Sequence, residues 1–180
     1  MFSRIKKEGD YVFGPGIRSK YDYDYASISD AMNEAYCSLL LRKLETWQEQ
    51  HGRFNAVVGI ETEGMRIGHI LSKMMKLPFY AMPHNRIELN QLGVPSLPPD
   101  THWLIVDDIV TTGTQFMNAV DNLEIEEKPE TITYACMIKR NPENLDYSAV
   151  AGDPDKEQKW VRHERFDFID KRLVALYAED

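Results

Sequence analysis

Residues able to do chemistry gather within one stretch of the sequence, residues 103–120. An apolar run there is followed by two adjacent acids, Asp107 and Asp108, and then by a short segment rich in hydroxyl groups. That segment consists of Thr111, Thr112, Gly113, Thr114 and Gln115. Adjacent carboxylates can accept hydrogen bonds from vicinal hydroxyls or hold a hydrated Mg²⁺, and threonine hydroxyls can donate to a phosphate. The stretch therefore predicts a site for a phosphorylated ribose.

The strand and helix expected on either side of this turn would make it suitable for binding an anion. Residues 104–106 predict a buried strand, and the spacing of Phe116, Met117 and Val120 predicts a helix after the turn. The N–H groups that open a helix have no partner within it and the helix dipole is positive there, so an anion is stabilised. A solvated turn with a threonine capping the helix is the alternative. The acids, hydroxyls and glycine fall together within residues 107–114, which favours a binding site.

Residues 54–82 repeat this order of elements. They predict a buried strand over 56–60, a helix over 65–75 opened by Gly64, and a second strand after Pro78. A strand, helix and strand in this order predict a right-handed unit within a parallel sheet. The connection after the first strand would then lie at the carboxyl edge of the sheet, where open α/β sheets bind ligands. It consists of Glu61, Thr62, Glu63 and Gly64, and an acidic surface turn is the alternative.

Three further elements are expected around these units. The apolar spacing over 28–47 predicts an amphipathic helix capped by Ser27 or Ser29. Residues 11–26 predict a loop and an edge strand, or a hairpin covering the core, and residues 131–138 predict a core strand. The two cysteines belong to no metal or redox motif, so both are expected as reduced core thiols.

Composition restricts the class of protein. The chain has 180 residues, 43% of them apolar, which suits a single domain with a substantial core. Its formal charge of −8 argues against a nucleic-acid partner. No apolar run is long enough to span a membrane, and the N-terminus lacks the apolar core of a signal peptide. We expect a soluble, cytoplasmic protein without a membrane partner.

The residues over 106–114, VDDIVTTGT, resemble the phosphoribosyl pyrophosphate (PRPP) signature of the type I phosphoribosyltransferases. The resemblance implies an α/β fold with a central parallel sheet, flanking helices and a small hood, and it implies a homodimer. By the same resemblance, Asp107 and Asp108 would bind the ribose hydroxyls, and residues 111–115 would bind the 5′-phosphate. The connection of residues 61–64 would meet pyrophosphate. Its two glutamates imply a bridging Mg²⁺, which Asp107 and Asp108 would hold directly, through water or through PRPP.

The hood and the base site have several candidates. Residues 9–29 resemble the N-terminal hood of orotate phosphoribosyltransferases, whereas residues 146–168 resemble the C-terminal hood of the 6-oxopurine enzymes. A hood is therefore expected from about residues 10–27, from 145–170, or from both. The residues expected to contact the base are Tyr23, Lys139, Arg140 and Trp160.

The long segment 83–101 departs from the family pattern. The corresponding loop of the family closes over the active site and carries lysines, but this segment contains none. His84 and Arg86 are its only cationic candidates for contact with the leaving pyrophosphate, and solvated loop charges are the alternative.

The resemblance implies a PRPP-dependent transferase that makes a nucleoside 5′-monophosphate and pyrophosphate, in nucleotide biosynthesis or salvage. Thr111 stands where many 6-oxopurine enzymes place an aspartate that serves the purine, and threonine is no general base near neutral pH, which favours an orotate-like enzyme. Lys139 and Trp160 favour a 6-oxopurine base (hypoxanthine, guanine or xanthine). A non-catalytic regulator that binds PRPP or a nucleotide is a third possibility, and a Mg²⁺-dependent phosphatase using Asp107 is a weaker fourth.

Overall fold

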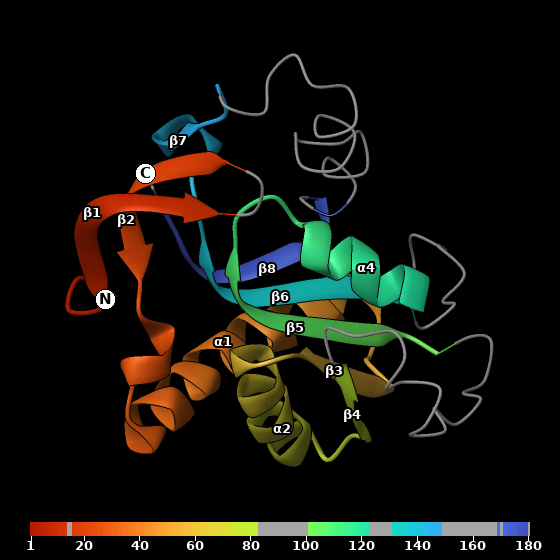
Figure 1. Ribbon diagram of the computed structural model, residues 1–180. Helices are drawn as coiled ribbons and strands as arrows, with labels where there is room; N and C mark the ends of the chain where they lie inside the picture. Colours follow the sequence, from red (N-terminus) through yellow and green to blue (C-terminus); the bar gives the residue numbers. More distant parts are fainter. Residues whose placement is uncertain (14–15, 83–100, 123–130, 149–168, 170, 180) are drawn as a thin grey trace.

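A five-stranded parallel sheet forms the centre of the protein (Figure 1). The computed structural model describes residues 1–13, 16–82, 101–122, 131–148, 169 and 171–179. The strand order is β4-β3-β5-β6-β8, and every neighbouring pair is parallel. The bounds are β3 (Ala56–Ile60), β4 (Phe79–Met82), β5 (Trp103–Val110), β6 (Ile132–Lys139) and β8 (Leu173–Ala178). The expected central parallel sheet is confirmed.

Helices cover both faces of this sheet, which explains the continuous apolar runs of its strands. On one face, α1 (Asp30–His51) and α2 (Glu63–Met75) contribute Leu40, Leu44 and Leu71 to a core with alternate strand residues. On the other face, α4 (Thr114–Asn122) packs Phe116 and Val120 against the remaining strand residues (Figure 1). Both cysteines are buried free thiols, as expected.

The first helix extends beyond its predicted end. Ser29 caps α1, because its hydroxyl accepts a hydrogen bond from the backbone N–H of Met32. The helix continues past Trp47 to His51 and stops at Gly52, whose φ of 92° lies in the left-handed region. The last turn is polar on most sides, so the apolar spacing gave no sign of it.

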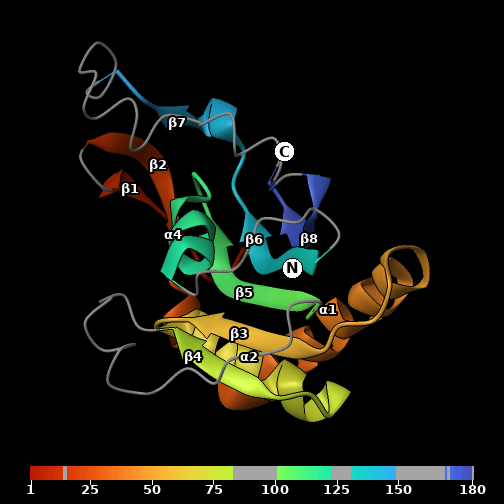
Figure 2. The same cartoon turned by 90° about the vertical axis from the view of Figure 1, so that its right-hand side faces the viewer.

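A smaller antiparallel sheet stands beside the carboxyl end of the main sheet (Figures 1 and 2). Its strands are β1 (Lys6–Phe13), β2 (Ile17–Tyr23) and β7 (Leu145–Asp146), in the order β1-β2-β7. We call this sheet the hood. The N-terminal segment is thus a hairpin, and a short strand after β6 pairs with it through Arg18 and Ser19.

Two short 3-10 turns complete the described elements. Residues Tyr25–Ser27 connect the hood to α1, and residues Pro142–Asn144 connect β6 to β7. None of the helices in the described ranges is long and apolar enough to cross a membrane.

Candidate active site

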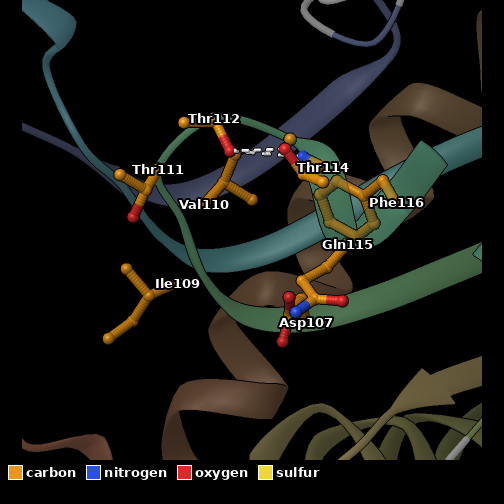
Figure 3. A pocket seen from close by; sticks show the side chains of 9 residues that line it. Asp107, Ile109, Val110, Thr111, Thr112, Thr114, Gln115 and Phe116 are labelled. Atoms are coloured by element: carbon orange, nitrogen blue, oxygen red, sulfur yellow. Dashed lines mark hydrogen bonds between the residues drawn. The ribbon is translucent and has the colours of Figure 1, made fainter. Parts of the chain in front are cut away.

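The turn between β5 and α4 encloses a cavity of about 90 Å³ (Figure 3). The hydroxyls of Thr112 and Thr114 lie 2.8 Å apart across it, and the backbone N–H of Thr114 faces the Thr112 hydroxyl at 3.4 Å. Gly113 has a φ of 78°, a value that favours glycine, and this conformation turns the chain into α4. The cavity is lined by Asp107, Ile109, Val110, Thr111, Thr112, Gly113, Thr114, Gln115 and Phe116. One cavity is therefore lined by hydroxyl donors, the first residues of a helix and a carboxylate.

The two acids lie within the second half of β5, which continues to Val110 instead of ending before them as expected, and they are held by the backbone that follows them. Asp107 is 7% exposed and its Oδ1 accepts a hydrogen bond from the N–H of Asp108 at 2.9 Å. Asp108 accepts from the N–H of Ile109 at 2.8 Å. Burial, and then the adjacent charge of Asp108, raise the pKa of Asp107 well above its ordinary value, and burial raises the pKa of Asp108 as well. Carboxylates withdrawn from water in this way are fixed acceptors for the hydroxyls of a ligand.

The connection from β3 to α2 touches the acid pair. A methyl group added to Gly64 would lie 2.6 Å from the carbonyl oxygen of Val106 and 3.2 Å from Oδ1 of Asp107. The peptide between Glu61 and Thr62 is cis. Gly64, the last residue of the connection 61–64 that we call the acidic loop, therefore lies against Asp107.

Arg66 lies next to the acidic loop, although no sequence motif marked it as a site residue. Its Nε lies 3.2 Å from Oε2 of Glu63, one turn earlier in α2. A glutamate and an arginine three residues apart at a helix start form a recognisable pair, so the sequence did contain a signal for it.

Two of the residues predicted to contact the base bind other parts of the protein. Arg140 is 2% exposed, and its guanidinium donates to the carbonyl of Tyr21 at 2.9 Å and to Oδ1 of Asp22 at 2.6 Å. Tyr23 is 4% exposed, and its hydroxyl donates to Glu179 at 2.8 Å. These contacts join the hood to the main sheet, and a contact of either residue with a base stays a prediction.

The other predicted contacts divide between the described and the undescribed parts of the chain. Lys139 is half-buried at the end of β6, on the edge of the sheet that carries the acid pair. His84, Arg86 and Trp160 lie outside the described residues, so their roles stay predictions. Within the described ranges, no three metal-binding side chains come together to form a site for an ion.

Comparison with known proteins supports the resemblance to phosphoribosyltransferases. No family model matches the chain. Orotate phosphoribosyltransferase of Aeropyrum pernix is 28% identical over 116 residues, which cover 64% of this chain and 62% of that relative. A crystal structure of orotate phosphoribosyltransferase from Aeropyrum pernix superposes with a TM-score of 0.63 at 20% identity, covering 97% of this chain and 88% of that chain.

A second type of transferase has a similar fold. Adenine phosphoribosyltransferase from Giardia lamblia, in a crystal structure with 9-deazaadenine, superposes with a TM-score of 0.57 at 18% identity. The match covers 96% of this chain and 93% of that chain. The protein therefore has the α/β fold of the type I phosphoribosyltransferases, and its sequence is similar to that of an orotate phosphoribosyltransferase.

Proposed function

We propose that this protein is a PRPP-dependent nucleobase phosphoribosyltransferase of the orotate-like type. The observation that carries the proposal is the shared cavity at the end of β5, which combines Asp107 with the hydroxyl-rich turn of residues 111–115 (Figure 3). A ribose 5-phosphate needs acceptors for its hydroxyls and donors for its phosphate, side by side. The similarity to an orotate phosphoribosyltransferase supports the same assignment.

The roles of the residues follow from the bond changes. The bond from ribose C1 to pyrophosphate breaks, a bond from C1 to a base nitrogen forms, and the base gives up a proton. Positive charge develops on the ribose ring, so the rate depends on positioning and on electrostatic stabilisation rather than on a covalent nucleophile. Asp107 and Asp108 hold the ribose hydroxyls and favour the cationic ring. Residues 111–115 bind the 5′-phosphate, and the acidic loop beside Asp107 receives pyrophosphate.

Magnesium fits this site as an ion that arrives with the substrate. Mg²⁺ usually binds one or two carboxylates and completes its shell with substrate phosphates and water. The described residues supply such a pair, Asp107 and Asp108, but no larger cluster of metal-binding side chains. When bound, the ion would neutralise charge on the leaving pyrophosphate. A homodimer and a cytoplasmic location are further parts of this proposal.

The test is release of pyrophosphate from PRPP and Mg²⁺ with orotate, uracil, hypoxanthine, guanine, xanthine or adenine. We expect release with one base, and none with Asp107→Asn plus Asp108→Asn. Asp10→Asn is a matched control because this hood aspartate is exposed and does not line the cavity. Release with orotate identifies the orotate-like enzyme, and release with hypoxanthine or guanine identifies the 6-oxopurine alternative. Silence with every base while PRPP still binds would instead identify a regulator.

A further inference from the structure

The Arg66 side chain connects three segments that meet beside the cavity. Its Nε forms an ion pair with Oε2 of Glu63 at 3.2 Å without hydrogen-bond geometry, and its Nη2 donates to the carbonyl of Ile28 at 3.1 Å. The guanidinium also lies 6.0 Å from the centre of the Tyr25 ring. Ile28 and Tyr25 belong to the connection between the hood and α1. Arg66 is thus anchored on that connection while it faces the acidic loop.

These groups lie close to the acid pair. Tyr25 is buried and its hydroxyl donates to Oδ1 of Asn33 at 2.6 Å. Burial raises the pKa of Tyr25, the charge of Arg66 opposes this, and the charges of Asp108 and Glu63 add to it. Asp108, Glu63 and Arg66 therefore act electrostatically on one buried hydroxyl.

The negative charge of the acidic loop opposes pyrophosphate binding, and the positive charge of Arg66 can offset it. Pyrophosphate is strongly anionic, and a loop with two glutamates would repel it. Glu63 is 18% exposed at its side chain and Arg66 is 30% exposed, so the pair is only partly screened by water. With Glu63 neutralised by the guanidinium, much of the repulsion from the loop is removed.

We infer that Arg66 is a positioning residue that neutralises and orients Glu63, and so lets the acidic loop accept pyrophosphate. The inference rests on the proposed function, because it concerns the acidic loop that this function assigns to pyrophosphate. Arg66 acts through Glu63 and not by direct contact with the reacting atoms.

The test is the affinity for magnesium pyrophosphate, measured by calorimetry at low salt without any base. Arg66→Met should weaken binding on the order of tenfold, because the Glu63 charge is left unpaired beside the ligand. Arg66→Met combined with Glu63→Gln should recover most of that loss. Lys73→Met is the matched control, since Lys73 is an exposed cation at the far end of the same helix, and it should bind as the unmutated protein does.

Glu63→Gln by itself provides a second variant in which the arginine is kept. It should bind magnesium pyrophosphate more tightly than the unmutated protein, and the gain should shrink as salt is added. Arg66→Lys should lie between the unmutated protein and Arg66→Met, because lysine keeps the charge but loses the fixed fork of donors.

The outcomes separate this inference from the proposed function. If no base supports turnover, the transferase proposal fails, whereas the pyrophosphate affinities still decide the role of Arg66. The inference is overturned if the unmutated protein does not bind magnesium pyrophosphate, or if Arg66→Met binds it equally well. It is also overturned if the double variant binds as weakly as Arg66→Met, because the loss would then come from the missing tether to Ile28.

Discussion

Asp107 combines a functional role with a cost to stability. Its pKa is raised by burial and by the charge of Asp108, so the folded protein binds a proton more readily than the unfolded chain. Stability therefore falls as pH rises from the ordinary pKa of an aspartate through the raised value, so an aspartate at this position lowers stability at neutral pH. Because an aspartate here costs stability, its presence is better explained by ligand binding than by packing.

We predict that Asp107→Asn is inactive but more stable. The amide oxygen can still accept from the N–H of Asp108, so the local backbone is retained. The gain in unfolding free energy at neutral pH should be on the order of 1 kcal/mol, which corresponds to a few degrees in melting temperature for a domain of this size. Thermal melts at neutral and mildly acidic pH measure it, and the gain should shrink in acid. A loss of stability at neutral pH would contradict this account.

Among single residues, those of the candidate site could be predicted from the sequence where they are adjacent in the chain. Asp107 and the turn of residues 111–115 were predictable because one strand, one turn and one helix place them. The contact between Arg140 and Asp22 was not predictable, since these residues are separated by 118 positions and no local pattern links them. For the same reason, the hydrogen bond between Tyr23 and Glu179, 156 positions away, was not predictable.

Glycines allow the elements around the site to pack closely against one another. A methyl group added to Gly59 or Gly68 would lie about 3.0 Å or closer to atoms of α2, β3 or Phe79. A methyl group added to Gly64 would lie as close to atoms of β5. The absence of side chains at these positions lets α2 approach the strands, and this approach brings the acidic loop against Asp107. The packing of one helix therefore sets the spacing of two parts of the site.

Gly64→Ala tests this packing. The new methyl group would meet the Val106 carbonyl at 2.6 Å and Cα of Asp107 at 2.9 Å, and backbone cannot move aside cheaply. We expect a loss of about 1–3 kcal/mol in unfolding free energy together with reduced pyrophosphate release. Gly9→Ala is the control, because the atoms nearest to its methyl group would belong to the Tyr11 side chain and not to backbone. If Gly64→Ala matched Gly9→Ala in stability and activity, close packing of α2 would not be needed.

A second group of contacts ties elements together at the opposite edge of the sheet. The Thr133 hydroxyl on β6 accepts from Nε1 of Trp47 on α1 and bonds to Nε2 of His102, each at 3.1 Å. His102 is 7% exposed and lies just before β5. With the Trp47 indole as donor to Thr133, the threonine hydroxyl can donate to His102, which suits a neutral imidazole.

This arrangement predicts a loss of stability in mild acid. Burial lowers the pKa of His102 from 6.5 to about 4, so in mild acid the unfolded chain binds a proton that the folded protein does not bind. The stabilisation is complete above the ordinary pKa and is lost as pH falls from about 6.5 towards 4. Unfolding in urea at several pH values should show this slope, and His102→Gln should reduce it. His69→Gln is the control because His69 is exposed, and an equal reduction there would contradict the assignment.

The sequence predicted elements best where burial is continuous. The strands β3, β5 and β6 were predictable because both faces of the sheet are covered and each strand contains a continuous apolar run. The last turn of α1 was missed because its exposed residues carry no apolar spacing. The hood was harder still, since the pairing of β2 with β7 joins residues more than a hundred positions apart.

At the scale of the whole molecule, two ionic contacts fasten the hood to the main sheet. Arg140 follows β6 and binds Tyr21 and Asp22 of the hairpin, while its guanidinium lies 4.5 Å from the Phe13 ring centre. Glu179 follows β8 and accepts from Lys6 at 3.0 Å and Tyr23 at 2.8 Å. Burial opposes ionisation of Glu179, but these bonds and the N–H of Asn141 outweigh it and lower its pKa.

Arg140→Met should therefore loosen the hood before any ligand binds. We expect amide hydrogen exchange in β1 and β2 to accelerate on the order of tenfold, with little change in β3, β5 and β6, because a local opening loses only its own contacts. Arg18→Met is the matched control, since Arg18 also lies in the hairpin but its ion pair with Asp10, at 3.4 Å, is exposed. Unchanged exchange in Arg140→Met, with a loss of base-dependent turnover alone, would restore Arg140 to the predicted role of a base contact. Faster exchange without ligand would instead show that the arginine builds the hood over the cavity, so that any effect on the base follows from the position of the hood.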